Sequence, residues 1–574
     1  MKPINQDLNQ ARQEPIRIWP GIVIVTLQWL FRFVVPYFFP DTLIIGILSI
    51  LAFGLTMVIW WAFFSRAPLF ERWVAIFLII AALFATSQII DKSIATANVG
   101  LMFAIYSIPV MCLAFVIWVV VSKNFPVRLR RLTMVITILL ASGFWALLRT
   151  DGMDAEIHHE FAWRWAKTAE ELLPAFSTNK NTSVSFDSAV KAQDPEWAGF
   201  RGTNRDAIVR GVVIETDWTK NPPIEMWRRS IGPACSSFSV HGSLIFTQEQ
   251  RGESELVTCY NLNTGEPVWI HTDSTRFWDA HAGAGPRSTP TLNKGHVYSM
   301  GATGIVNVLD EQTGAVIWTR NAAKDTHVEI PGWGYTGSPL VADSTVFITI
   351  SGQILAYNIA NGNLCWSGKD GGESYSSAHL MISNGTKQIL FSNKEGLTSY
   401  VPSNGNILWK VSWPGIRVIQ PALINENEIL INQEEKKSLR RISVIKNSEG
   451  WKIKERWTSD NLKPDYNDII IHNGYAYGFE GLFLTCINLE NGEPKWRGGR
   501  YGGQLLLLAD EDILLVLTEK GELVLVKASP DQFKELARFK AIKGKTWNHP
   551  VLIGNVLLVR NALEMAAFRL QFAR

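Results

Sequence analysis

Eight polar residues occupy one recurring position of the sequence, each just before a short apolar run. The runs begin SSFSV, STPTL, GSPLV, SSAHL, IQPAL, NDIII, GQLLL and NHPVL. If each run is the first strand of a repeat around a common axis, the eight side chains form a ring that could be the floor of a ligand-binding site. Its one carboxylate, Asp468, is a candidate general base. Alternatively, the ring only satisfies backbone groups or holds channel water. The ring consists of Ser237, Thr289, Ser338, Ser377, Gln420, Asp468, Gln504 and His549.

Larger side chains crowd the same positions along the sequence. Guanidinium groups suit a carboxylate-rich ligand, and aromatic faces can stack on its rings. The same residue types are the usual anchors of protein-binding surfaces, so both interpretations stay open. With Gln420, Asp468, Gln504 and His549 of the ring, the candidate ligand-binding residues are Arg287, Tyr335, Tyr375, Arg417 and Trp547, and Tyr466 lies beside them.

The elements that would position these side chains are marked by a repeated glycine four residues before a tryptophan. The copies read NTGEPVW, QTGAVIW, ANGNLCW, SNGNILW and ENGEPKW. Strand-like runs flank each copy, so we expect hairpins whose turn glycine takes a positive φ. The pairs are Gly265 and Trp269, Gly314 and Trp318, Gly362 and Trp366, Gly405 and Trp409, and Gly492 and Trp496.

The spacing of these tryptophans predicts a β-propeller. Weaker copies end at Trp227, Trp457 and Phe539, which gives a period of 40 to 50 residues with several short strands each. Three strands after Phe539 lack a final tryptophan strand, whereas IEMW at 224–227 is a final strand without predecessors. Together they form one blade that closes a ring of eight and removes the exposed sheet edges.

These motifs resemble the tryptophan-docking repeat of pyrroloquinoline quinone (PQQ)-like propellers. That superfamily includes quinoprotein alcohol dehydrogenases and the non-enzymatic propeller lipoprotein of outer-membrane assembly. The resemblance covers about residues 195–574. WAGFRGTNRD (197–206), GPRSTPT (285–291) and PGWGYTGSP (331–339) are similar to the membrane-linked PQQ-like repeat propellers of bacteria. The resemblance implies an eight-bladed all-β fold, and it is not specific for function.

Two functions follow from the resemblance. A binding or scaffold propeller, with a protein partner on its face, is favoured because the blades are short and loops that would bury a cofactor are few. The alternative is a PQQ-dependent dehydrogenase that oxidises an alcohol or sugar and passes electrons to membrane quinone. That enzyme would bind PQQ with calcium, yet the ring offers a single acid, and we predict no metal site. Lys/Arg blocks typical of nucleic-acid binding do not occur.

The segment before the propeller differs in composition. Residues 19–148 contain about five apolar runs of membrane-spanning length. Arg32 in the first run is expected to snorkel to its far end. Basic residues gather in the tail 1–18 and after the second and fourth runs, which predicts a cytoplasmic N-terminus and a periplasmic propeller on a bacterial inner membrane.

Residues 149–194 should connect the two domains. The segment 154–176 has the spacing of an amphipathic helix on the membrane surface, and the polar stretch after it reads as a linker. His158 and His159 beside Glu160 could suggest a metal, but further ligands at suitable spacing are lacking. The five cysteines fall in a span or in different blades, which predicts free thiols.

Overall fold

The chain forms two compact units in the computed structural model. The model describes residues 16–39, 42–153, 159–174, 176, 194–415, 418–433 and 438–573. The first unit comprises Met1–Met153 and His159–Ala166, and the second comprises Asp154–His158 and Lys167–Arg574.

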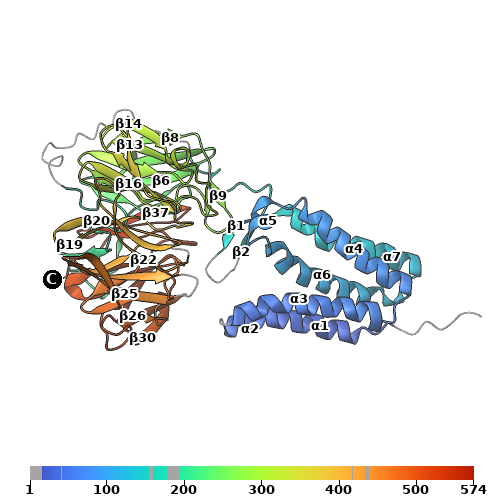
Figure 1. The fold of residues 1–574 in the computed structure, drawn as a ribbon. Helices are drawn as coiled ribbons and strands as arrows, with labels where there is room; N and C mark the ends of the chain where they lie inside the picture. Colours follow the sequence, from blue (N-terminus) through green and yellow to red (C-terminus); the bar gives the residue numbers. More distant parts are fainter. Residues whose placement is uncertain are drawn as a thin grey trace, which may run out of the picture. The chain divides into compact units, whose positions relative to one another are not determined.

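The first unit is a helical bundle (Figure 1). Five of its helices are long and apolar enough to cross a membrane: Trp19–Phe38, Ile44–Phe64, Leu69–Ser87, Met102–Asn124 and Val127–Leu147. The elements are α1 (Trp19–Trp29), the π-helical turn η1 (Leu30–Val34), α2 (Val35–Phe38), α3 (Leu43–Ile59), the π-helical turn η3 (Trp60–Phe64), α4 (Leu69–Ser87), α5 (Lys92–Thr96), α6 (Met102–Val121), η4 (Ser122–Asn124), α7 (Val127–Gly143) and η5 (Phe144–Leu147).

A β-hairpin closes one end of this unit. Strand β1 (Leu148–Met153) pairs antiparallel with β2 (His159–Trp163). The expected amphipathic helix over 154–176 is therefore wrong at 159–163, and residues 154–158 lie outside the described part. The strand is favoured because alternate residues share one face. Phe161 packs on Tyr106, with ring centroids 5.3 Å apart, and Trp163 packs on Phe144 at 6.1 Å.

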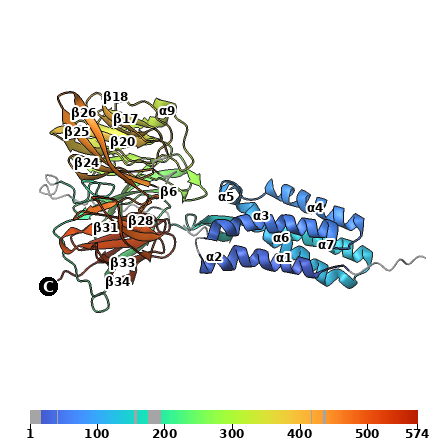
Figure 2. The same ribbon diagram turned by 60° about the horizontal axis from the view of Figure 1, so that its bottom comes forward.

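The second unit is an eight-bladed β-propeller, as the repeats predict (Figures 1 and 2). Each blade is an antiparallel four-stranded meander, and its inner strand comes first. Blade 1 consists of β5 (Ser239–His241), β6 (Leu244–Arg251), β7 (Ser254–Asn261) and β8 (Pro267–Asp273), and blade 2 consists of β11 (Thr291–Asn293), β12 (His296–Met300), β13 (Ile305–Asp310) and β14 (Val316–Asn321). Blade 3 consists of β15 (Leu340–Ala342), β16 (Thr345–Ile350), β17 (Gln353–Asn358) and β18 (Leu364–Ser367), and blade 4 consists of β19 (His379–Ser383), β20 (Thr386–Asn393), β21 (Gly396–Tyr400) and β22 (Ile407–Ser412).

The remaining four blades complete the circle. Blades 5 to 8 are β23 (Ala422–Asn425), β24 (Glu428–Gln433), β25 (Ser438–Asn447), β26 (Gly450–Ser459); β27 (Ile470–His472), β28 (Tyr475–Glu480), β29 (Phe483–Asn488), β30 (Pro494–Arg500); β31 (Gly503–Leu508), β32 (Ile513–Thr518), β33 (Glu522–Lys527), β34 (Glu535–Lys540); and β35 (Val551–Ile553), β36 (Val556–Arg560), β37 (Glu564–Arg569), β4 (Ile224–Ser230). The sequence prediction of a closing blade with one early and three late strands is confirmed.

The core lies between the blades rather than inside any one of them. Middle strands such as β32 are buried on both faces because each blade packs against a neighbour on either side. The docking tryptophans join neighbours directly. In six of them the indole Nε1 donates to a backbone carbonyl of the next blade, at 2.7 to 3.0 Å. Trp409 departs from this pattern and donates to Gln388 Oε1 of its own blade at 2.7 Å.

Candidate functional site

The predicted ring of eight polar residues connects one blade to the next. The Ser237 amide donates to Thr289 Oγ1 at 2.9 Å, the Thr289 amide to Ser338 Oγ at 3.0 Å, and the Ser338 amide to Ser377 Oγ at 3.0 Å. These bonds satisfy amides at the starts of the inner strands. Much of the ring's hydrogen-bonding capacity is therefore used within the propeller.

In the other half of the ring, longer side chains also make hydrogen bonds between neighbouring blades. The Gln420 amide donates to Asp468 Oδ1 at 3.2 Å, and Gln504 Nε2 donates to the Trp547 carbonyl at 3.1 Å. Ser237 Oγ closes the circle onto the His549 carbonyl at 2.6 Å. Burial lowers the pKa of His549 well below its usual value, so its imidazole is neutral.

A segment of the chain itself occupies the axis of the propeller. We call Trp197–Val209 the plug. It bridges blade 1 at Val240, accepts a bond from the Leu292 amide of blade 2, and pairs in parallel with β31 of blade 7 through β3 (Ile208–Val209). Phe200 packs on His549 of blade 8, with ring centroids 5.1 Å apart. The plug thus contacts blades on every side of the axis.

Two arginines of the plug hold the remaining blades. Arg205 donates to the carbonyls of Ser338, Pro339 and Ala378 in blades 3 and 4, and Gln420 Nε2 donates back to the Arg205 carbonyl at 2.6 Å. Burial lowers the pKa of Arg205 to about 10. The guanidinium is still charged at neutral pH, and the inward carbonyls solvate it.

Arg201 fixes the only carboxylate of the ring. Its Nη2 donates to the Ile469 carbonyl at 2.8 Å, and its Nη1 lies 3.7 Å from Asp468 Oδ1. Burial raises the pKa of Asp468, and the charge of Arg201 opposes that shift. The carboxylate is enclosed by the plug and is only 5% exposed, so it has no route to a substrate at the channel opening.

The sequence analysis did not predict the plug, although it used residues 197–206 as part of the family resemblance. It has no hydrophobic period because its contacts are made by backbone and by arginines. What marks the plug is its backbone conformation. Arg201, Arg205 and Ala207 have φ values of 59°, 56° and 59°, which residues other than glycine adopt only where the surrounding structure enforces them.

The loops that precede the inner strands surround the channel opening, which we call the mouth. Its aromatic residues are paired: Trp333 on Tyr375 at 4.6 Å between centroids, and Tyr466 on Trp547 at 5.4 Å. Lys545 lies over the Trp547 ring and donates to the His281 carbonyl at 2.7 Å. Trp333 and Lys545 are mouth residues that the sequence analysis did not select.

Tyr335, another predicted site residue, lies away from the mouth. Tyr335 is 1% exposed and donates from Oη to the Val328 carbonyl at 2.6 Å, so it belongs to the core between blades 2 and 3. Arg417 lies outside the described residues.

Arg287 is at the mouth, but its guanidinium already donates hydrogen bonds to other groups of the propeller. They reach Asp279 and the carbonyls of Gly283, Ala284 and Trp333. Asp279 has its pKa lowered to about 2: burial acts to raise it, and hydrogen bonds from His281 together with the Arg287 charge outweigh burial.

The side chains present do not fit a carboxylate-rich quinone such as PQQ. Arg287 is neutralised by Asp279, and Asp468 by Arg201, while the plug fills the floor beneath them. In the described ranges, groups of three or more His, Cys, Asp or Glu side chains placed to hold a metal ion are absent.

The repeats agree with a known family model. Residues 253–419 match the model described as outer membrane protein assembly factor BamB. The second unit is thus a β-propeller that contains PQQ-like repeats. A curated relative of the PQQ-like propeller, outer membrane protein assembly factor BamB of Yersinia pestis, is 25% identical over 154 residues, which is 25% of this chain and 36% of the relative. The match thus spans about a third of that relative's length.

Solved structures with some similarity in fold to this chain include two from bacteria. BamB from Moraxella catarrhalis has 14% identity and a TM-score of 0.45, and the match covers 60% of this chain and 99% of that one. The quinohemoprotein alcohol dehydrogenase ADHIIG from Pseudomonas putida HK5 has 11% identity and a TM-score of 0.46, with 67% and 82% covered.

Proposed function

We propose that this chain is a membrane-anchored binding module whose PQQ-like propeller docks a protein partner on its mouth, outside the cytoplasm. The plug is the observation that carries the proposal. The arginines of the plug fill the channel, and the hydrogen bonds of the ring join the blades above it. The propeller is therefore rigid, and its mouth is the face that presents aromatic and charged side chains. Docking requires only such a face, whereas dehydrogenase chemistry requires an accessible base and cofactor pocket.

The mouth has the chemistry of a protein-binding surface. The half-buried Trp333, Tyr466 and Trp547 supply rigid aromatic area, and Lys545 adds charge among them. The match to an assembly-factor family supports the same class of role. Anchoring is supported by the five apolar helices, and the position of basic residues between them supports a periplasmic propeller on a bacterial inner membrane.

Site-directed photocrosslinking of the full chain in its native membrane tests the docking face. A photoreactive phenylalanine replaces Trp333 or Tyr466 at the mouth, and Lys294 or Asp343 serves as the control in turns at the far ends of the inner strands. We expect one discrete adduct from both mouth positions and none from the controls. Equal adducts from all four positions, or none from the mouth, would reject the proposal.

Calorimetric titration of the solubilised full chain with PQQ plus calcium tests the dehydrogenase alternative. We expect no saturable heat, because the candidate cation and carboxylate are already paired. Saturable binding at micromolar or tighter concentration would overturn the assignment as a binding module.

A further inference from the structure

The helical unit contains a buried cluster of polar side chains near the end at which the hairpin β1–β2 sits. Arg32, on the first long helix, is 6% exposed, and its guanidinium carbon lies 5.6 Å from the ring centroid of Tyr106 on α6. The expectation that Arg32 snorkels to the helix end is therefore wrong. It points into the bundle, six residues before the helix ends at Phe38, or roughly 9 Å along the axis.

The local backbone explains why Arg32 turns inward. Pro36 has no N–H, so the Arg32 carbonyl cannot accept the usual bond from four residues ahead. The helix widens into the π-helical turn η1, where the Val35 amide bonds back to the Leu30 carbonyl. Gly46 of α3 lets the two helices approach here, because a Cβ at that position would lie 2.9 Å from the Phe31 carbonyl oxygen.

The cluster presents hydrogen-bonding atoms that have no partner within the described part of the protein. These are Arg32 Nε, Gln28 Oε1 and Trp145 Nε1, on side chains that are 6%, 0% and 4% exposed. In the part of the chain that the structure describes, Arg32 has no carboxylate within ion-pair distance. A buried guanidinium among apolar helices without an anion is costly, and two of the three orphaned atoms are donors. An oxyanion placed between Arg32 Nε and Trp145 Nε1 would satisfy both donors.

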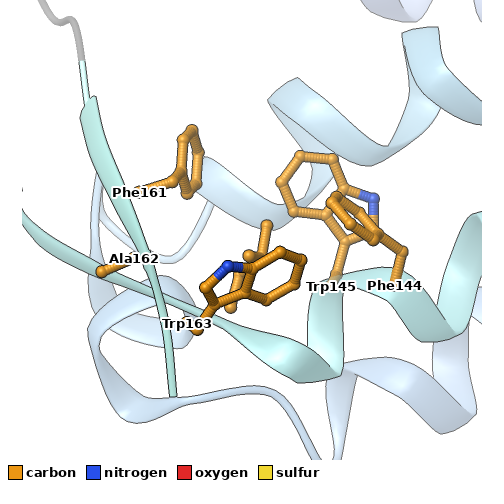
Figure 3. Close-up of a pocket in the computed structure, with 6 residues that line it drawn as sticks. Phe144, Trp145, Phe161, Ala162 and Trp163 are labelled. Atoms are coloured by element: carbon orange, nitrogen blue, oxygen red, sulfur yellow. The ribbon is translucent and has the colours of Figure 1, made fainter. Parts of the chain in front are cut away.

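An aromatic pocket of about 370 Å³ shares Trp145 with this cluster. Figure 3 shows the side chains that line the pocket. Its walls come from η5, β1 and β2, and they are Phe144, Trp145, Leu148, Phe161, Ala162 and Trp163. Trp145 and Phe161 also pack on Tyr106, with centroid distances of 6.2 and 5.3 Å. The same aromatic residues thus connect an apolar pocket to the buried cation.

We propose that this end of the helical unit binds one acidic phospholipid, with its phosphate at Arg32 and Trp145 and an acyl chain against the aromatic pocket. Charge complementarity selects an anion, and the apolar pocket selects one that carries a chain. Tyr106 and the hairpin β1–β2 connect the phosphate site at Arg32 to the aromatic pocket. The inference rests on the proposed membrane anchoring, which carbonate extraction of the chain from membranes tests separately.

The test measures thermal unfolding of the full chain in bicelles. Phosphatidylglycerol is compared with phosphatidylcholine of the same acyl chains, and inorganic phosphate is added alone in a third arm. We expect phosphatidylglycerol to raise the melting temperature of the wild type by several degrees and phosphate to leave it unchanged. Phosphate reproducing the whole shift would replace the lipid by a free anion and overturn the proposal.

Two variants with a matched control assign the effect to this site. In Arg32→Gln the phosphatidylglycerol shift should vanish, while stability in phosphatidylcholine stays equal to or above that of the wild type, since a buried unpaired charge is removed. Lys92→Gln, an exposed cation of α5 at the same end, should keep the full shift. A full shift in Arg32→Gln, or its loss in Lys92→Gln, would reject the site.

A second readout guards against a variant that fails to fold. Trp145→Phe keeps an aromatic ring but removes the orphaned N–H together with the pyrrole part of the indole, and native mass spectrometry counts the retained lipid. We expect one phosphatidylglycerol per wild-type chain and roughly tenfold weaker retention in Trp145→Phe, the loss expected of a hydrogen bond to a charged group. Equal retention of both lipids by the wild type would overturn the proposal.

Discussion

At the scale of single residues, each repeat glycine serves the tryptophan of the preceding blade as well as its own turn. Gly314 has φ 70°, and a Cβ added there would lie 2.5 Å from Trp269 Cε3. The sequence predicts the positive φ from the turn. It does not reveal the facing tryptophan, which is 45 residues earlier and approaches only when the blades stack.

We expect Gly314→Ala to lower the free energy of unfolding by about 2 to 5 kcal/mol, from strain at positive φ plus overpacking. Gly295→Ala in the same blade is the control, because its φ is 75° and nothing lies within 4 Å of the added Cβ. It should lose only about 1 to 2 kcal/mol. Urea unfolding of the two variants measures the difference, and equal losses would remove the tryptophan contact from the explanation.

Glu255 makes propeller stability depend on pH. It is buried, Oε1 accepts from the Ala302 amide at 3.3 Å, and Oε2 has no partner among the described residues. Burial raises its pKa from 4.5 to about 7. The folded state therefore binds the extra proton between these values, and the contribution of Glu255 to stability is lost as pH rises through that window.

Replacement of Glu255 by Gln should remove this dependence. We expect Glu255→Gln to match the wild type near pH 4.5 and to exceed it above pH 7 by about 1 to 3 kcal/mol. Melting temperatures at pH 4.5, 6 and 8 measure the effect. A difference that is constant with pH would show that the carboxyl does not titrate in this window.

At the scale of elements, the propeller could be predicted from sequence where periodicity carries the information. The tryptophan spacing predicts the eight blades and the composition of the closing blade. Strand β2 was predicted as part of a helix over 154–176, because residues 159–163 are too few for their alternation to outweigh the helical spacing around them. The plug carries no period at all, so neither its place in the channel nor the ion pair of Arg201 with Asp468 could be predicted.

The plug should also be the element that holds the channel together. Arg205→Met leaves three carbonyls of blades 3 and 4 without their donor, and we expect a loss of about 3 kcal/mol or more in propeller stability. Arg210→Met, just past the plug, removes an exposed guanidinium paired with Asp206 and should change stability by about 0.5 kcal/mol or less. Thermal unfolding and native-state proteolysis compare the two, and similar behaviour would mean that the plug does not stabilise the ring.

At the scale of the whole molecule, the proposed orientation can be tested with a native thiol. Cys365 in β18 is exposed, whereas Cys112, Cys259 and Cys486 are buried. We expect a membrane-impermeant maleimide applied to intact spheroplasts to label the wild type and to label Cys365→Ser far less. Labelling that appears only after lysis would place the propeller in the cytoplasm.

The closing blade has a consequence for how the protein is made. Strand β4 pairs with β37, although more than 300 residues separate Ser230 from Glu564. At ribosomal rates this gap corresponds to roughly 20 to 70 s, during which β4 has no sheet to join. The plug emerges earlier still, so it is synthesised before all the blades that it contacts in the finished propeller. Ring closure therefore follows synthesis, and the nascent propeller exposes unpaired strand edges that a holding chaperone would have to cover until the last blade arrives.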